Sequence, residues 1–99
     1  MVHIAFDRAQ VAEFCRKWKV RELSLFGSVL RDDFGPESDV DVLVEFAPGG
    51  GITFDSRVAM LDELRAIFGR EVDLVEKRTL RNPFRRHAIL RSKETVHAS

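Results

Sequence analysis

Two aspartates, Asp39 and Asp41, stand two positions apart at the head of an apolar run. Alternate residues of a strand point to the same side, so these carboxylates would project together while Val40 and Val42 face the other way. Adjacent carboxylates repel each other, and a divalent cation that prefers oxygen ligands would remove the conflict. The pair therefore predicts a metal site, and Mg²⁺ is the expected ion.

A Gly-Ser turn lies upstream of this pair, where Gly27 and Ser28 follow another apolar run. The turn offers free backbone N–H groups, a hydroxyl and no side chain that would block close approach, as a metal-bound phosphate chain requires. Ser28 could also cap a short helix, and the two roles are compatible. Arg31 has two equally weighted interpretations, which are pairing with phosphate and pairing with Asp32 or Asp33.

Apolar spacing predicts the strands that would position these residues. They are expected at Leu23 to Phe26, Val40 to Phe46 and Val72 to Val75. A short helix over Val29 to Phe34, followed by a turn over Gly35 to Ser38, would connect the first two strands. The aspartate pair would then lie at the start of the second strand.

Three longer helices are predicted by apolar residues at helical spacing. The first opens at Asp7 and Gln10, which resemble a capping box. The second stops at Gly69, and the third opens at Asn82-Pro83 and is followed by a polar tail. The apolar stripes are, in chain order, Val11, Phe14, Cys15 and Trp18; Phe54, Val58, Leu61, Leu64 and Phe68; and Phe84, Ile89 and Leu90. Helices that alternate with strands predict an α/β (α+β) fold, a small mixed β-sheet flanked by helices.

Size and composition narrow the function classes. The 99 residues predict a single domain over 1–99, and the formal net charge of zero gives no bulk attraction to nucleic acid or anionic lipid. No apolar run is long enough to span a bilayer, and the first residues do not resemble a signal peptide. The single cysteine, Cys15, is interpreted as a core residue and fits a reducing compartment, so we expect a cytoplasmic protein.

The segment after the third predicted strand is basic within this neutral chain. It could be a solvated helix face, or it could dock an acidic partner or contact nucleotide phosphates. The sequence leaves these alternatives open. The basic residues are Lys77, Arg78, Arg81, Arg85, Arg86, Arg91 and Lys93.

A Gly-Ser turn, an Asp-x-Asp at the head of a strand and a third aspartate, Asp73, in a later strand together resemble the nucleotidyltransferase superfamily related to DNA polymerase beta. The closer resemblance is to the minimal nucleotidyltransferases. Three stretches carry it: Leu25 to Phe46, Gly69 to Val75 and Leu80 to Arg86. Taken alone, Asp73 could instead be a surface residue on an edge strand.

The resemblance implies a mechanism with two metal ions. Asp39 and Asp41 would bind the Mg²⁺ that arrives with a nucleoside triphosphate, and Asp73 would complete a second site and favour deprotonation of the incoming hydroxyl. Gly27 and Ser28 would hold the β- and γ-phosphates. Two ions about 3.5–4 Å apart would stabilise the attacking and leaving oxygens of in-line displacement at the α-phosphate.

The resemblance also implies a partner. Minimal nucleotidyltransferases are commonly antitoxins of HEPN-type ribonuclease toxins, and their implied activity is transfer of AMP from ATP to a tyrosine of the toxin. This chain contains no tyrosine, so it cannot modify itself at that residue type. The alternative is an antitoxin of the same fold that neutralises its toxin by binding alone. Transfer of a nucleotide to a small molecule is less favoured, because no acceptor domain is visible.

Overall fold

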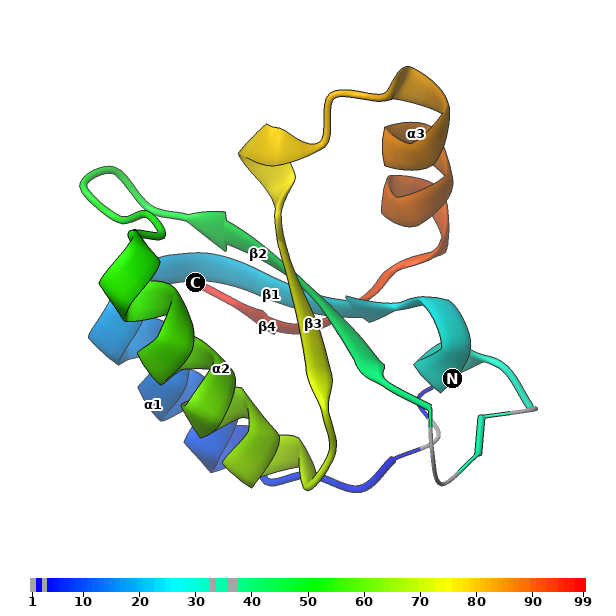
Figure 1. Cartoon of the computed structure of the whole chain (residues 1–99), viewed down its shortest axis with the longest axis horizontal. Coiled ribbons are helices and arrows are strands. Elements are labelled where there is room, and N and C mark those ends of the chain that lie inside the picture. Colours follow the sequence, from blue (N-terminus) through cyan, green and yellow to red (C-terminus); the bar gives the residue numbers. More distant parts are fainter. Residues whose placement is uncertain (1, 3, 33, 36–37) are drawn as a thin grey trace.

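The fold is built on a four-stranded mixed sheet with helices on both faces (Figure 1). The computed structural model describes residues 2, 4–32, 34–35 and 38–99. The strands are β1 (Val20–Phe26), β2 (Val40–Phe46), β3 (Val72–Glu76) and β4 (Glu94–Ala98), in the spatial order β3-β2-β1-β4. Strand β1 is antiparallel to both β2 and β4, whereas β2 and β3 are parallel. The predicted mixed sheet flanked by helices is confirmed.

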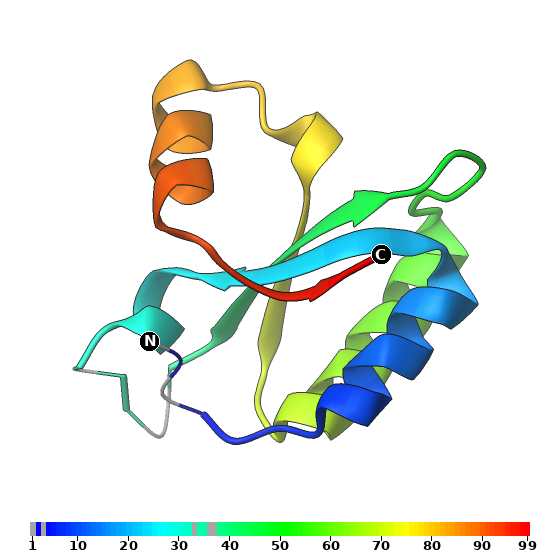
Figure 2. The same ribbon diagram turned by 180° about the vertical axis from the view of Figure 1, so that it is seen from behind.

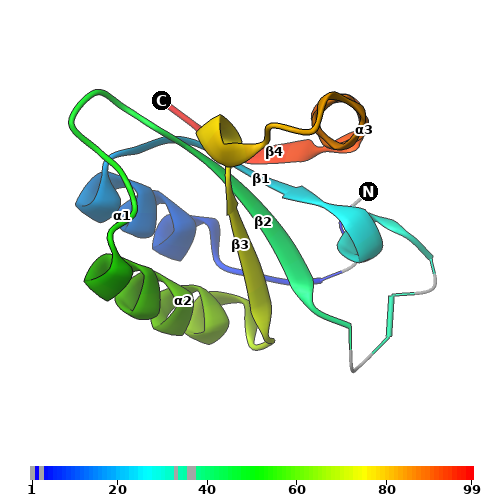
Figure 3. The ribbon, with the colours of Figure 1, turned by 45° about the horizontal axis from the view of Figure 1, so that its top comes forward.

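Two helices cover one face of the sheet and a third lies over the other. Helices α1 (Arg8–Trp18) and α2 (Phe54–Phe68) lie on the same side, and α3 (Pro83–Ser92) lies on the opposite side (Figure 3). Two short 3₁₀ turns, η1 (Gly27–Leu30) and η2 (Lys77–Thr79), directly follow β1 and β3. None of the helices in the described part of the chain is long and apolar enough to cross a bilayer.

Local sequence signals account for the helix ends. The Asp7 carboxylate accepts a hydrogen bond from the N–H of the second helical residue of α1, and the Asn82 side chain accepts two from the first turn of α3. Pro83 begins α3, as predicted. Helix α2 opens with a capping box at Thr53 and ends at Gly69, which takes the left-handed conformation at φ 68°.

The main core lies between the sheet and the α1/α2 layer. Val11, Phe14 and Cys15 of the first predicted stripe are buried, as predicted. Alternate strand residues complete this core. The buried strand residues on this side are Val20, Leu23, Leu25, Val40, Val42, Val44, Phe46, Val72, Leu74 and Val96.

The predicted apolar stripe of α2 is wrong at its N-terminal end. Phe54 is 89% exposed and Val58 is 56% exposed, whereas Met60, Leu64 and Phe68 are buried. At 3.6 residues per turn, Val58 lies about 120° around the helix from Leu64 and therefore faces away from the sheet.

Arg57 is the residue that reaches the sheet from the first turns of α2. Its Nη2 donates a hydrogen bond to the Leu74 carbonyl of β3, at 2.9 Å. A similar correction applies to α3, where Phe84 is 86% exposed while Ile89 is buried. Both predicted stripes therefore extended too far toward the helix N-terminus.

The predicted polar tail is wrong, because residues 94–98 form β4. Figure 2 shows β4 lying alongside β1, and the register pairs Ser24 with Thr95. Val96 is buried on the α1/α2 side. One apolar residue among polar neighbours gives almost no local strand signal, so this strand depends on pairing with a segment about seventy positions away.

The segment after the Gly-Ser turn also differs from the prediction. A single 3₁₀ turn over Gly27–Leu30 replaces the helix expected over 29–34, and Arg31 already has an extended backbone at φ −101° and ψ 152°. Within the predicted turn over 35–38, the Ser38 N–H donates to the Gly35 carbonyl at 3.1 Å. Residues 33, 36 and 37, which those predictions include, lie outside the described residues.

Candidate active site

The face of the sheet beneath α3 carries the candidate site residues Asp41 and Asp73. Strand β2 alternates, so Val40 and Val42 point into the main core while Asp41, Leu43 and Glu45 point toward α3. Three regions follow one another along this face: the aspartates, a small apolar patch, and a network of lysine–glutamate ion pairs. The apolar patch consists of Phe26, Leu43, Leu80 and Ile89, with Val75 and Leu90 packed against it.

Asp41 and Asp73 are direct neighbours in the sheet. The parallel register of β2 and β3 pairs their Cα positions, so the two side chains share one face. Asp41 is partly buried and Asp73 is exposed. The structure therefore places the third predicted carboxylate, Asp73, beside Asp41 of the Asp-x-Asp pair, on the face of the sheet toward α3.

The groups around Asp41 shift the pKa of its carboxyl group. Burial raises the pKa of Asp41, and the negative charges of Asp73 and, more weakly, Asp39 raise it further. A hydrogen bond from the Ser28 backbone N–H and the positive charge of Arg31 act in the opposite direction, and the net shift is upward. Four other residues singled out from the sequence thus act on the partly buried Asp41 carboxyl group.

Gly27 combines a left-handed backbone with close contact to the Asp41 carboxylate. Its φ is +73°, in the left-handed region, and a Cβ atom there would overlap Asp41 Oδ2. Next to it, the Ser28 hydroxyl donates to the Asp39 carbonyl at 3.2 Å. The absence of a side chain at residue 27 was predicted to admit phosphate, and in the structure it admits a carboxylate.

The three aspartates do not form a closed ligand set as they stand. Among residues 2, 4–32, 34–35 and 38–99, no three His, Cys, Asp or Glu side chains lie close enough together to hold a metal ion. Their donor chemistry nevertheless fits a hard cation. All three offer carboxylate oxygens, and the repulsion that raises the pKa of Asp41 is what a bound divalent ion would relieve.

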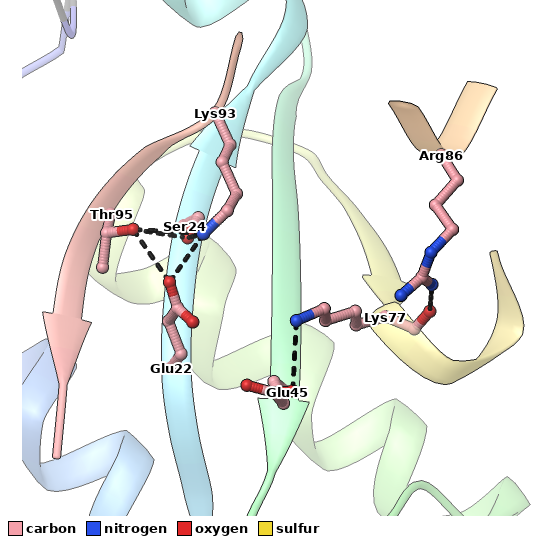
Figure 4. Close-up of polar contacts among 7 residues, drawn as sticks. All are labelled: Glu22, Ser24, Glu45, Lys77, Arg86, Lys93 and Thr95. Carbon is pink, nitrogen blue, oxygen red and sulfur yellow. Dashed lines mark hydrogen bonds and ion pairs between the residues drawn. The ribbon is translucent and has the colours of Figure 1, made fainter. Parts of the chain in front are cut away.

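The ionic network at the far end of the same face was not predicted. Lys93 Nζ lies 2.6 Å from Glu22 Oε1, and Lys77 Nζ lies 3.2 Å from Glu45 Oε2 (Figure 4). The hydrogen bond from Lys93 lowers the pKa of Glu22, and Thr95 also donates to this carboxylate. These contacts join α3, β4 and η2 to the two central strands.

The basic segment therefore divides into three groups, of which one is Arg78 alone, paired with Glu76. Lys77 and Lys93 belong to the ionic network, and Arg86 Nη1 donates to the Lys77 carbonyl at 3.0 Å (Figure 4). Their roles are internal, which neither sequence interpretation anticipated. A docking role remains a prediction for the exposed Arg81, Arg85 and Arg91, for which no ion pair is found within the described residues.

Comparison with known proteins places this arrangement among related sequences. The model of the nucleotidyltransferase domain matches residues 8–96. The "Putative protein adenylyltransferase MJ1379" of Methanocaldococcus jannaschii is 36% identical over 73 residues, which are 74% of this chain and 73% of that protein. The "Protein adenylyltransferase MntA" of Thermococcus cleftensis is 34% identical over 74 residues, 75% of this chain and 73% of that protein.

Solved structures share the fold. The "putative minimal nucleotidyltransferase" is 31% identical, with a TM-score of 0.71 over 88% of this chain and 86% of that one. A toxin–antitoxin crystal structure with AMP-PNP has a TM-score of 0.73 at 18% identity, over 94% and 74% of the two chains. A tri-AMPylated Shewanella oneidensis HEPN toxin in complex with its MNT antitoxin gives 0.63 at 17% identity, over 93% and 70%.

Proposed function

Since the chain belongs to the nucleotidyltransferase domain family, we propose that it is an antitoxin that transfers AMP from ATP to a tyrosine hydroxyl of a HEPN-type toxin. The observation that carries this proposal is the pairing of Asp41 with Asp73 beside Gly27, whose left-handed backbone lies against the Asp41 carboxylate. Neighbouring carboxylates that raise the pKa of one of them are typical of functional sites.

In the proposed reaction, the tyrosine oxygen forms a bond to the α-phosphorus of ATP. The bond from that phosphorus to the oxygen bridging to the β-phosphate breaks, and pyrophosphate leaves. Asp73, exposed beside Asp41, would favour loss of the tyrosine proton. Asp39 and Asp41 would hold Mg²⁺, which supplies charge neutralisation of the triphosphate when bound.

The Gly-Ser turn would bring the phosphates close to these carboxylates. Gly27 leaves the approach to Asp41 open, and Ser28 presents its N–H to Asp41 and its hydroxyl to the Asp39 carbonyl. Arg31 lies near enough to Asp41 to lower its pKa, so its positive charge is also available near the phosphates. The turn thus orders the two carboxylates and the phosphate approach together.

Related proteins support the proposed substrate and partner. MntA of Thermococcus cleftensis is named a protein adenylyltransferase. A structural neighbour was crystallised as a toxin–antitoxin with AMP-PNP, a non-hydrolysable analogue of ATP. In another neighbour, the HEPN toxin bound to an MNT antitoxin carries three AMP groups.

Intact-mass spectrometry tests the proposal directly. A HEPN toxin encoded beside this chain, incubated with it, ATP and Mg²⁺, is expected to gain the mass of AMP. The gain should disappear when the toxin's tyrosines are replaced by phenylalanine, and also with the Asp41→Asn variant. A toxin that is inhibited yet unchanged in mass would instead establish the second candidate, an antitoxin that acts by binding alone.

Asp73→Ala separates chemistry from binding. Because Asp73 lies on a different strand from the Asp39 and Asp41 pair, Mg²⁺-ATP affinity in titration calorimetry should stay nearly unchanged while single-turnover transfer falls steeply. Transfer at the normal rate would mean that the third carboxylate lies elsewhere, with Glu71 and Glu76 as the next candidates.

A further inference from the structure

Asp39 lies one residue before β2, so the sheet ladder alone does not fix its position. Three backbone groups around it are held from three different places. Arg70 donates to the Ser38 carbonyl at 3.3 Å, and the Ser28 hydroxyl donates to the Asp39 carbonyl at 3.2 Å. The Val40 N–H donates to the Glu71 carbonyl at 2.9 Å. The backbone that presents the Asp39 carboxylate is therefore held on both sides, while the side chain itself stays exposed.

Arg70 makes the most extensive of these contacts. Its Nη1 also donates to the Gly35 carbonyl at 2.6 Å, and its guanidinium carbon lies 4.5 Å from the centroid of the Phe34 ring. The Ser38 N–H donates to that same Gly35 carbonyl. Arg70 thus binds both ends of one turn and stacks on the residue that enters it, a combination that a planar guanidinium allows and an ammonium does not.

The position of Arg70 in the chain links it to the other half of the site. It follows Gly69, where α2 stops in the left-handed conformation, and it comes three residues before Asp73. One short segment therefore supplies both the third carboxylate and the contact that holds the turn before the first. A shift of this segment would move Asp39 and Asp73 together.

We propose that Arg70 is a positioning residue that holds the turn before Asp39, and so keeps the Asp39 carboxylate in reach of Asp41 and Asp73. The inference rests on the proposed function for its catalytic consequence. Outer contacts that orient metal ligands typically change metal affinity or activity by about 10–100-fold when they are removed. Arg70 is expected to act in this way through the backbone.

The main test compares Arg70→Met with Arg65→Met. Arg65 is a suitable control because it lies near the same helix end and because its ion pairs with described residues are to the exposed carboxylates of Asp62 and Glu71. Binding of Mn²⁺, a spectroscopic substitute for Mg²⁺, is measured by electron paramagnetic resonance on the complete chain without nucleotide. Arg70→Met should bind Mn²⁺ about 10-fold more weakly than the wild type, and Arg65→Met should bind it equally well.

Two further measurements separate positioning from general stability. In metal-free hydrogen exchange, Arg70→Met should speed exchange at Val40 while leaving the amides of α1 unchanged. In transfer assays, kcat should fall about 10-fold with little change in KM for the toxin. Arg70→Lys keeps the charge without the planar stack and should lie between wild type and Arg70→Met.

Wild-type Mn²⁺ affinity in Arg70→Met would overturn the inference, even if its melting temperature falls. If Arg70→Met does not fold, Arg70→Lys and Phe34→Leu take its place in the same measurements. If the wild-type chain transfers no AMP, the proposed function is wrong. The role of Arg70 is still decided by Mn²⁺ binding and hydrogen exchange.

Discussion

The two faces of the sheet carry different kinds of side chain. The face toward α1 and α2 is continuous valine, leucine and phenylalanine, whereas the face toward α3 holds two paired aspartates, a small apolar patch and two lysine–glutamate ion pairs. Strand β2 contributes to both, because its residues alternate between them. One strand can therefore anchor the fold with its valines and carry the site with its aspartates, and changes to the two faces should separate stability from activity.

The largest expected effect is on activity alone. Asp41→Asn or Asp39→Asn should abolish AMP transfer because each removes a proposed metal ligand. Burial and nearby carboxylates raise the pKa of Asp41, so its ionised form opposes folding, and this penalty grows as pH rises through that pKa. The metal-free melting temperature of Asp41→Asn should therefore equal or exceed that of wild type at neutral pH, and the difference should vanish in acid. Activity in the purified double variant would disprove the metal assignment.

On the opposite face, Leu64→Ala should lower stability and leave transfer activity near normal. Leu64 is fully buried beneath the sheet, and truncating such a leucine costs about 2–5 kcal/mol of unfolding free energy. Urea unfolding should show this loss, while transfer per folded molecule at low temperature stays near normal. A selective loss of activity at full stability would mean that the two faces are not independent.

Gly27→Ala tests a position where stability and the proposed activity both depend on one residue. The left-handed backbone alone should cost about 1–2 kcal/mol, and the new methyl group must also displace the Asp41 carboxylate. Gly69→Ala is the matched control, because its φ is +68° and a Cβ there meets nothing within 4 Å. Both variants should lose similar stability, but only Gly27→Ala should lose transfer activity. Equal activity in both would show that the close approach is unimportant.

The smallest effect is expected in the ionic network. Glu22→Gln keeps an oxygen that can accept hydrogen bonds from Lys93 and Thr95 and removes only the negative charge, so it should cost about 1 kcal/mol at pH 7. The hydrogen bond from Lys93 lowers the pKa of Glu22 in the folded state, so this stabilisation is present above the unfolded pKa and is lost as pH falls through the folded one. Melting curves of the two proteins should therefore converge in acid. A constant difference across pH would point to packing instead.

Local signals predicted the elements that carry the site. The boundaries of β2 agree with the prediction, because Asp, a run of valine and leucine, and then Ala-Pro-Gly mark both ends. Asp7 and Asn82 cap their helices as predicted, since capping depends on neighbouring residues alone. The predicted capping box at Asp7 is not formed among the described residues, because Asp7 accepts from the Ala9 N–H and not from Gln10. The proximity of Asp73 to Asp41 followed from the resemblance, and the parallel register supplies its physical basis.

Features that depend on distant partners were missed. Strand β4 has little apolar pattern of its own and exists because β1 offers an edge. The exposure of Phe54 follows from how α2 lies on the sheet, which helical spacing cannot fix. The sequence gives no sign of the role of Arg70, because its hydrogen-bond partner, the Gly35 carbonyl, lies in a distant part of the chain. In each case the deciding neighbour is remote in sequence.

The place of β4 beside β1 has a consequence for the edge of the sheet. Residues 20–76 contain β1, β2 and β3, so the pairing of Asp41 with Asp73 needs no contribution from β4. Until residues 94–98 pair, the outer edge of β1 exposes unpaired N–H and carbonyl groups, which are a template for pairing with another strand. Detachment of β4 would therefore open one edge of the sheet to other strands while leaving Asp41 and Asp73 paired.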